Sequence, residues 1–190
     1  MLRRTIAGVV ALVLRPVRVE SEIWLWIREF VTHLPGELGI LIRASFYNRY
    51  LKRGAADLTI LPGAILEHPQ QVEFGRKCTV GRNSILDGMG GLSVGDSAGI
   101  GPMVFVHTAN HEYEDRSKPF LEQGHVLKPV VIEADAWLAA RVTVLPGTHV
   151  GRGAVIMAGA VISGPIKPYA ICGGNPARPI GSRGQAAQSA

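Results

Sequence analysis

The segment VVIEADAWLAARVTVLPGTHVGRGAVIMAGAVI, residues 130–162, is the most regular part of a stretch from Phe74 to Ile162 in which bulky apolar residues recur every six positions. These residues form four groups of three, separated by breaks of eight, twenty-six and six positions. The groups are Phe74, Val80 and Leu86; Val94, Ile100 and Val106; Ile132, Leu138 and Val144; and Val150, Ile156 and Ile162. A second residue, in most cases small or β-branched, stands two positions before each bulky one. Residues two apart point to the same side of a strand, so the pattern predicts short strands with one buried side.

A period of six excludes the commoner folds. On an α-helix it would spread the apolar residues around the whole cylinder. A meander needs repeated hairpin turns, and the region offers a single candidate dipeptide, Asp87-Gly88. A fixed repeat indicates instead a solenoid whose units stack on their neighbours. Three six-residue faces make a triangular turn of about eighteen residues, so we predict a mainly β protein with four coils of a parallel β-helix.

Composition places the chain among globular proteins of one domain plus an appendage, with 190 residues, 47% apolar and 18% charged. Cys78 and Cys172 form neither a metal spacing nor a disulfide framework, which favours the reducing cytoplasm. The net charge of +5 belongs entirely to residues 1–54, where nine Lys or Arg face four Glu. The remaining residues balance at zero, so the solenoid has no nucleic-acid footprint.

Residues 1–54 predict an appended α-helical segment. Met1–Leu14 has two arginines and about ten apolar residues, too few to cross a bilayer, and no convincing signal cleavage site. Ser21–His33 predicts a helix capped by Ser21, and a third helical stretch follows Leu34-Pro35-Gly36 and ends near Leu51. Two interpretations stay open: the helices cap the open end of the solenoid, or they anchor the chain to the inner face of the membrane.

The sixfold count is interrupted in three places. It is poor from Ala55 to Gln71, where Leu58, Ile60, Gly63 and Ile65 predict an irregular first coil. Gly88–Gly91 adds two residues, and residues 107–127 predict an extruded polar loop with three histidines, of the kind that usually carries function. After Ile162 four prolines are predicted to end the solenoid, leaving an extended segment and a disordered tail at 182–190.

Five motifs stand in order along the chain. They are Ile100-Gly101-Pro102 with Thr108-Ala109-Asn110-His111, Ala136-Trp137-Leu138-Ala139, Val144–Gly151, Ala158–Ile162, and Pro168-Tyr169 with Gly174-Asn175-Pro176-Ala177. Together they resemble bacterial hexapeptide-repeat O-acetyltransferases over Ala55–Gly181, and residues 1–54 loosely resemble the extensions of sugar and exopolysaccharide acetyltransferases. The resemblance implies a left-handed β-helix at residues 55–181, acetyl-CoA as co-substrate without a required metal, and a homotrimer with its site between neighbouring subunits.

The same resemblance assigns His111 as the general base that helps an acceptor hydroxyl attack the thioester directly. The group that orients His111 stays open among Glu112, Glu114, Asp115 and a backbone carbonyl. Asn110 either contacts the acceptor or holds the loop. Asn83 and Asp87 are candidates for binding the acceptor, or are solvated turn residues.

For acetyl-CoA, five residues match positions that line the pantetheine groove, namely Trp137, Ala139, Ala140, Ala158 and Gly159. Trp137 has core packing as its alternative, and Lys167 and Arg178 are candidates for the CoA phosphates. The predicted function is acetyl transfer to a hydroxyl of a sugar or polysaccharide precursor. The alternatives are a serine or antibiotic acetyltransferase, a γ-carbonic-anhydrase-like enzyme with three histidines on zinc, and a non-catalytic scaffold.

Overall fold

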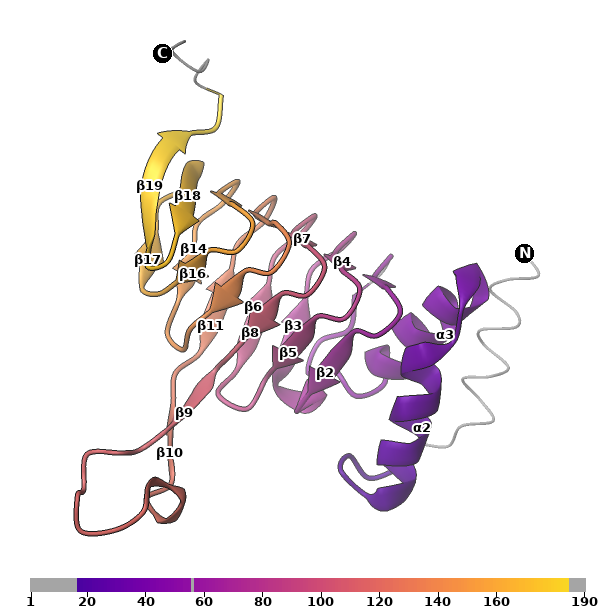
Figure 1. Cartoon of the computed structure of the whole chain (residues 1–190). Coiled ribbons are helices and arrows are strands. Elements are labelled where there is room, and N and C mark those ends of the chain that lie inside the picture. Colours follow the sequence, from indigo (N-terminus) through magenta and orange to yellow (C-terminus); the bar gives the residue numbers. More distant parts are fainter. Residues whose placement is uncertain (1–16, 56, 185–190) are drawn as a thin grey trace.

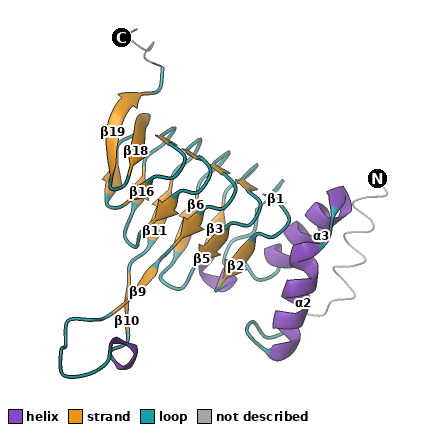
Figure 2. Cartoon of the chain, viewed as in Figure 1, coloured by secondary structure: helices purple, strands orange, loops and turns teal. Residues whose placement is uncertain are grey.

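The structure, a computed structural model, describes residues 17–55 and 57–184. Two helices, α2 (Glu22–His33) and α3 (Gly36–Asn48), precede a three-sided prism of stacked parallel strands (Figures 1 and 2). The predicted apolar start at Met1–Leu14 lies outside the described residues. The mainly β solenoid with an N-terminal helical segment is therefore confirmed.

The prism has three faces, named here in the order in which the chain first visits them. The first face carries β1 (Thr59–Ile60), β4 (Thr79–Val80), β7 (Gly99–Ile100), β12 (Trp137–Leu138), β15 (Val155–Ile156) and β18 (Ala170–Gly174), with β19 (Ala177–Ser182) antiparallel at its edge. The second carries β2 (Ile65–Glu67), β5 (Ile85–Asp87), β8 (Phe105–Val106), β13 (Thr143–Val144) and β16 (Val161–Ile162). The third carries β3 (Val72–Phe74), β6 (Leu92–Val94), β11 (Val130–Ile132), β14 (His149–Val150) and β17 (Pro165–Ile166).

The core is the inside of the prism. From Val72 to Ile162, each bulky residue of the sixfold pattern and each residue two positions before it is at most 2% exposed. The polar members are satisfied internally, since the hydroxyls of Ser84 and Thr148 donate to the carbonyls of Gly101 and Leu145 at 2.8 and 2.6 Å. The period of six therefore marks the side chains that are buried inside the prism.

The first coil is more regular than predicted. Ile60 and Leu66 keep the sixfold count and are both 0% exposed, whereas Ile65 pairs with Ile85 on the outer side of the second face. Leu66, and not the Ile65 named in the sequence analysis, therefore continues the count of six, since neighbouring strand residues point to opposite sides.

The solenoid also continues beyond Ile162. Pro165 begins β17, which pairs with β14, and β18 pairs with β15. Proline is tolerated there because β17 is the terminal strand of its sheet. Order extends past residue 182 as well, since Arg183 Nη1 lies 2.8 Å from Asp135 Oδ2, and residues 185–190 of the predicted tail lie outside the described part.

The two helices cover the open end of the first coil. Ser21 accepts a hydrogen bond from the Trp24 amide and begins α2 as predicted. Trp24 and Tyr47 are buried in the core, and the Tyr47 hydroxyl accepts from the Leu66 amide of β2 at 3.3 Å. Arg43 is 0% exposed and donates to the carbonyls of Leu34 and Ile60 at 2.6 and 2.9 Å, which joins the end of α2 to β1.

Candidate active site

The departures from the sixfold count gather at one corner of the prism, between the second and third faces, named here the loop corner. The first coil places η1 (Pro69–Gln71) there, and the second places Gly88–Gly91. The third coil extends at this corner into the loop of residues 107–129, which contains the antiparallel strands β9 (Ala109–His111) and β10 (His125–Leu127). The interruptions predicted from the sequence are therefore one stacked feature of the fold.

Thr108 fixes the neck of the loop. It is 0% exposed, and its hydroxyl donates to the Asp87 carbonyl at 3.0 Å and accepts from the Gly90 amide at 2.7 Å. The Thr108 carbonyl accepts from the Lys128 amide at 2.9 Å, which closes the two ends of the loop against each other. The two-residue insertion at Gly88–Gly91 therefore fixes the start of β9 through its hydrogen bonds with Thr108.

His111 ends β9 and lies opposite His125 in the ladder with β10. Its ring centroid is 4.4 Å from that of His125 and 5.1 Å from that of Phe120, which belongs to η2 (Phe120–Glu122). The Nδ1 atom is closed off from solvent and has no hydrogen-bond partner in the described part of the chain. This leaves Nε2 as the nitrogen available to a ligand.

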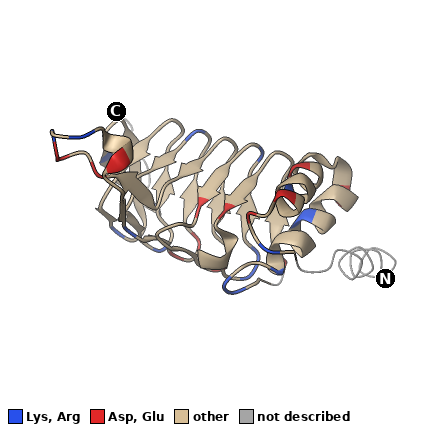
Figure 3. Ribbon diagram, turned by 90° about the horizontal axis from the view of Figure 1, so that it is seen from below, with Lys and Arg blue, Asp and Glu red and all other residues tan. Residues whose placement is uncertain are grey.

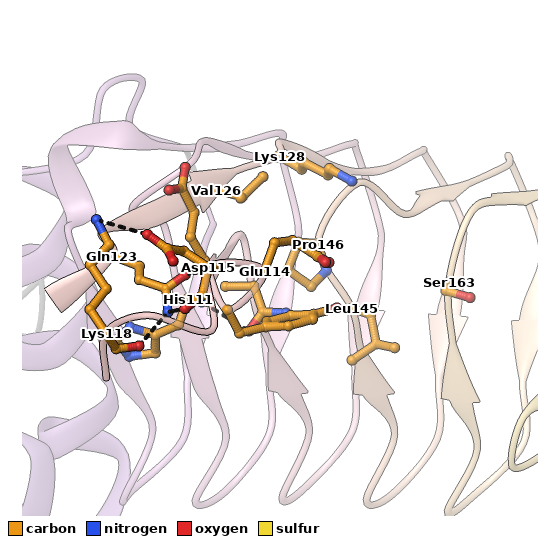
Figure 4. Close-up of a pocket in the computed structure, with 13 residues that line it drawn as sticks. His111, Glu114, Asp115, Lys118, Gln123, Val126, Lys128, Leu145, Pro146 and Ser163 are labelled. Atoms are coloured by element: carbon orange, nitrogen blue, oxygen red, sulfur yellow. Dashed lines mark hydrogen bonds and ion pairs between the residues drawn. The ribbon is translucent and has the colours of Figure 1, made fainter. Parts of the chain in front are cut away.

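A pocket of about 760 Å³ lies between the loop and the solenoid. Figure 4 shows that its walls come from the loop on one side and from the turns of later coils on the other. The lining residues are Asn110, His111, Glu112, Tyr113, Glu114, Asp115, Lys118, Gln123, Val126, Lys128, Leu145, Pro146 and Ser163. The volume is in the range of small-molecule sites.

The charged groups of the pocket differ in how they are held. Charged residues are sparse along the solenoid and frequent on the loop (Figure 3). Asp115 accepts from the hydroxyl and amide of Ser117 at 2.6 and 2.9 Å, and these bonds hold the pKa of its carboxyl below its usual range. For Glu112 and Glu114, no side-chain hydrogen bond or ion pair to a described residue is formed. None of these three carboxylates, nor a backbone carbonyl, accepts a hydrogen bond from Nδ1 of His111 within the described residues, so none of the predicted orienting partners is bonded to that nitrogen.

The three acceptor-binding candidates lie apart. Asn110 lines the pocket beside His111 and accepts a hydrogen bond from the His111 amide through Oδ1 at 3.0 Å. Asp87 is at the loop corner but only 7% exposed, because its Oδ1 accepts from the Met89 amide at 2.9 Å and lies 3.0 Å from His68 Nδ1. Asn83 is an exposed residue at the other end of β5, in the turn between the first and second faces. The structure brings only Asn110 together with His111.

The candidates for acetyl-CoA lie at a different corner, between the first and second faces, named here the alanine corner. Trp137 points outward on β12, where it is 53% exposed, so the alternative of core packing is wrong. Ala139 and Ala140 form the turn after β12, and Ala158 and Gly159 form the turn stacked above it, with the Gly159 amide donating to the Ala140 carbonyl.

The two basic candidates are both exposed. Lys167 lies in the turn between the third and first faces, and Arg178 lies on β19. Within one chain the pocket of His111 and the alanine corner are therefore separate.

The sequence analysis did not identify some residues that lie in the pocket of His111 or on the first face. In the pocket, Lys128, Leu145 and Pro146 join the loop residues because the turn after β13 stacks above the neck. Met157 and Ile180, which are 44% and 64% exposed, lie beside Gly173 of β18. Leu145 and Pro146 belong to a recognised motif, which was the one available signal, whereas Ile180 carries none.

No group of three or more His, Cys, Asp or Glu side chains in the described residues is arranged to hold a metal ion. The three histidines that a γ-carbonic-anhydrase-like centre requires do not converge there.

Part of the chain is similar to known proteins. The protein family described as bacterial transferase hexapeptide (six repeats) matches residues 129–164 of this chain. The chain is 33% identical over 119 residues to a probable acetyltransferase of Mycobacterium tuberculosis. The similarity to this relative covers 63% of the chain and 40% of the relative, so the match spans less than half of that protein's length.

Solved structures show the same fold as this chain. A hexapeptide-repeat-containing acetyltransferase from Vibrio cholerae, complexed with acetyl-coenzyme A, aligns with a TM-score of 0.71 at 23% identity, over 88% of this chain and 93% of that one. A maltose O-acetyltransferase from Clostridium difficile aligns with a TM-score of 0.69 at 20% identity, over 85% and 89% of the two chains.

Proposed function

We propose that this protein is an acetyl-CoA-dependent O-acetyltransferase that acts on a hydroxyl of a sugar or polysaccharide precursor. The observation that carries the proposal is the pocket at the loop corner, where an imidazole with an available Nε2 lies on an extruded loop beside a rigid solenoid. Its relatives support acetyl transfer, since the relative from Mycobacterium tuberculosis is named a probable acetyltransferase and the neighbour from Vibrio cholerae was solved with acetyl-coenzyme A.

The chemistry requires one base and no covalent enzyme intermediate. Nε2 of His111 takes the proton of the acceptor hydroxyl while its oxygen bonds to the thioester carbonyl carbon. When the tetrahedral intermediate collapses, the carbon–sulfur bond breaks and the imidazolium returns the proton to the leaving thiolate. Acetyl-CoA supplies the activated acyl group when bound.

A polyhydroxylated acceptor suits the polar part of the pocket. The carboxylates of Glu112 and Glu114, which are free of partners among the described residues, and the Asn110 amide offer hydrogen bonds to several hydroxyls. Tyr113 is 65% exposed and offers an apolar ring for one side of a pyranose. The maltose O-acetyltransferase among the structural neighbours supports the sugar class.

A homotrimer would complete the site. The outer side of the second face presents one half-buried, mostly apolar residue per coil: Ile65, Ile85, Phe105, Thr143 and Val161. Charged groups are absent from this row, as expected of a surface that packs against a copy of itself. If three copies turn this face to a common axis, rotation brings the loop corner of each copy beside the alanine corner of the next. Such a trimer places His111 of one copy near Trp137, Ala139 and Ala158 of another.

Acceptor screening with a CoA-release assay tests the function. We expect turnover with maltose or a related sugar, and a drop of roughly 10²–10⁴-fold in kcat for His111→Ala, the span of a general base. His107→Ala is the matched control, because His107 packs its ring on Phe105 at 3.9 Å and does not line the pocket. A fall in kcat of less than tenfold in His111→Ala would reject His111 as the general base. Turnover of serine, and not of a sugar, would indicate a serine acetyltransferase, and turnover of chloramphenicol would indicate an antibiotic acetyltransferase.

The N-terminal segment adds a proposed contact with the inner face of the membrane. Helix α2 buries Trp24, which packs on Phe46 of α3, while Ile23, Trp26 and Phe30 on its outer side are 63%, 75% and 70% exposed. None of the helices in the described part of the chain has the length and apolar character to span a bilayer. An exposed apolar row of this kind, in a segment that carries nine Lys or Arg and four Glu over residues 1–54, fits a peripheral site on anionic lipid.

Sedimentation with anionic liposomes tests the contact. Trp26→Ser with Phe30→Ser should lower the bound fraction several-fold, because these rings would carry the interfacial burial. Leu121→Ser, which changes a 71% exposed residue on the loop, is the control. Equal binding of all three proteins would reject the contact.

A further inference from the structure

The imidazole of His111 is held between two rings. The His125 ring lies across the β9–β10 ladder with its centroid 4.4 Å away and its plane tilted by 38°. The Phe120 ring meets it edge-on, at 5.1 Å and 84°. The Phe120 separation lies within the about 4.5–7 Å over which aromatic pairs prefer a defined mutual orientation, and the His125 ring lies at the short edge of that range.

No hydrogen bond performs this task within the described residues. Nδ1 of His111 is closed off from solvent and has no partner, although a second nitrogen bonded to a carboxylate or carbonyl is the usual way to orient a catalytic histidine. The Asp115 carboxylate is engaged with Ser117 and, at 3.7 Å, with Lys118. The ring contacts are therefore the interactions that fix the plane of the imidazole.

The far end of the loop is built to keep Phe120 in place. The side chain of Gln123 donates to the carbonyls of Asp115 and Lys118 at 2.8 and 3.0 Å, and its Oε1 accepts from the Asp115 amide at 3.0 Å. The Gln123 amide in turn donates to the Phe120 carbonyl. These bonds tie the turn η2 to the opposite strand of the loop, so the Phe120 ring is carried on a rigid support.

We propose that His125 and Phe120 are positioning residues that hold the imidazole plane of His111 by ring contact and keep Nε2 turned toward the pocket. The proposal rests on the proposed function for its kinetic consequence, because only a base needs a fixed orientation. The ring geometry itself is independent of that function. His125 acts in this proposal as a flat ring, not as a second proton carrier.

Four variants separate these roles. His125→Ala and Phe120→Ala remove a ring, whereas His125→Phe and Phe120→Tyr keep one. We expect kcat to fall roughly tenfold or more in the two alanine variants, since a freed side chain divides its time among staggered rotamers and misplaced groups react slowly. The KM for acetyl-CoA should stay within about twofold, and the ring-retaining variants should keep at least about a third of the activity. Leu121→Ala, in the same turn and with a side chain that is 71% exposed, is the matched control.

A second measurement does not need turnover. With ¹³C-labelled histidine, the His111 ring signal should broaden or shift in both alanine variants and stay near the wild-type position in His125→Phe and Phe120→Tyr. His125→Phe as inactive as His125→Ala would show that a nitrogen is needed and would overturn the proposal, as would an unchanged His111 signal in both alanine variants. If no acceptor is turned over by the wild type, the proposed function fails, and the ring signal alone decides the positioning.

Discussion

Gly90 and Thr108 join two consecutive coils where the loop leaves the solenoid, through a 2.7 Å hydrogen bond from the Gly90 amide to the Thr108 hydroxyl. The backbones approach so closely that a Cβ at Gly90 would collide with the Thr108 carbonyl oxygen, which itself accepts from the Lys128 amide. The position of β9, and with it His111, depends on this contact.

Gly90→Ala is therefore expected to displace the neck of the loop and lower kcat by about tenfold or more, while the solenoid stays folded. A CoA-release assay and a thermal melt measure the two effects. Met89→Ala, which keeps the amide bonded to Asp87, is the control. Full activity of Gly90→Ala would show that the neck does not position the site.

Arg43→Met tests the link between helices and solenoid. The guanidinium is fully buried and joins carbonyls at the end of α2 to Ile60, and burial lowers its pKa from the ordinary value. Removing it leaves buried carbonyls without donors, so we expect a loss of about 3 kcal/mol in the free energy of unfolding. Urea denaturation measures this loss, with the exposed Arg152→Met as the control. A loss below about 1 kcal/mol would contradict the prediction.

The sequence predicted the inward register from Phe74 to Ile162 because burial of one side of short strands leaves a periodic trace. It named Ile65 and not Leu66 for the first coil because the added residues at His68-Pro69 break the count before Phe74, and a short strand with apolar residues on both sides offers no other guide. The continuation through Pro165 was missed because a terminal strand tolerates a proline that an inner one excludes.

The candidate site was predictable in part. The interruption of the repeat located the loop, and the motif singled out His111 on it. Its ring partners were not predictable, because Phe120 and His125 stand nine and fourteen positions away and reach it only through the internal bonds of the loop. Asp87 looked like a free outward carboxylate, yet its bonds to His68 and Met89 depend on an added turn in the coil below.

Gly81→Ala tests the stacking of the turns. A Cβ at Gly81 would collide with the backbone of Gly101 in the next coil, so the turns must separate to admit it. We expect a loss of about 1–3 kcal/mol in unfolding free energy, the usual cost of overpacking. In Gly99→Ala, by contrast, the added Cβ would lie 3.5 Å from Trp137 in ordinary contact, and stability should change little. Equal stability of the two variants by urea denaturation would refute the close-stacking argument.

Glu133 should make stability depend on pH in the acid range. Its carboxylate lies 2.7 Å from His149 Nε2 and accepts from the Arg152 amide at 2.8 Å, and these bonds lower the pKa of Glu133 below its usual value. Because the folded pKa is depressed, the stabilisation is complete above the unfolded pKa of about 4.3 and is lost as the pH falls through the folded value. Glu133→Gln should therefore melt at a lower temperature than wild type at pH 6. This gap between the two melting temperatures should close as the pH drops below about 4. Glu114→Gln, which changes a carboxylate free of partners among the described residues, should show no such closing gap. A gap in Glu133→Gln that stays constant from pH 6 to pH 3 would mean that the carboxylate's charge contributes nothing at this turn.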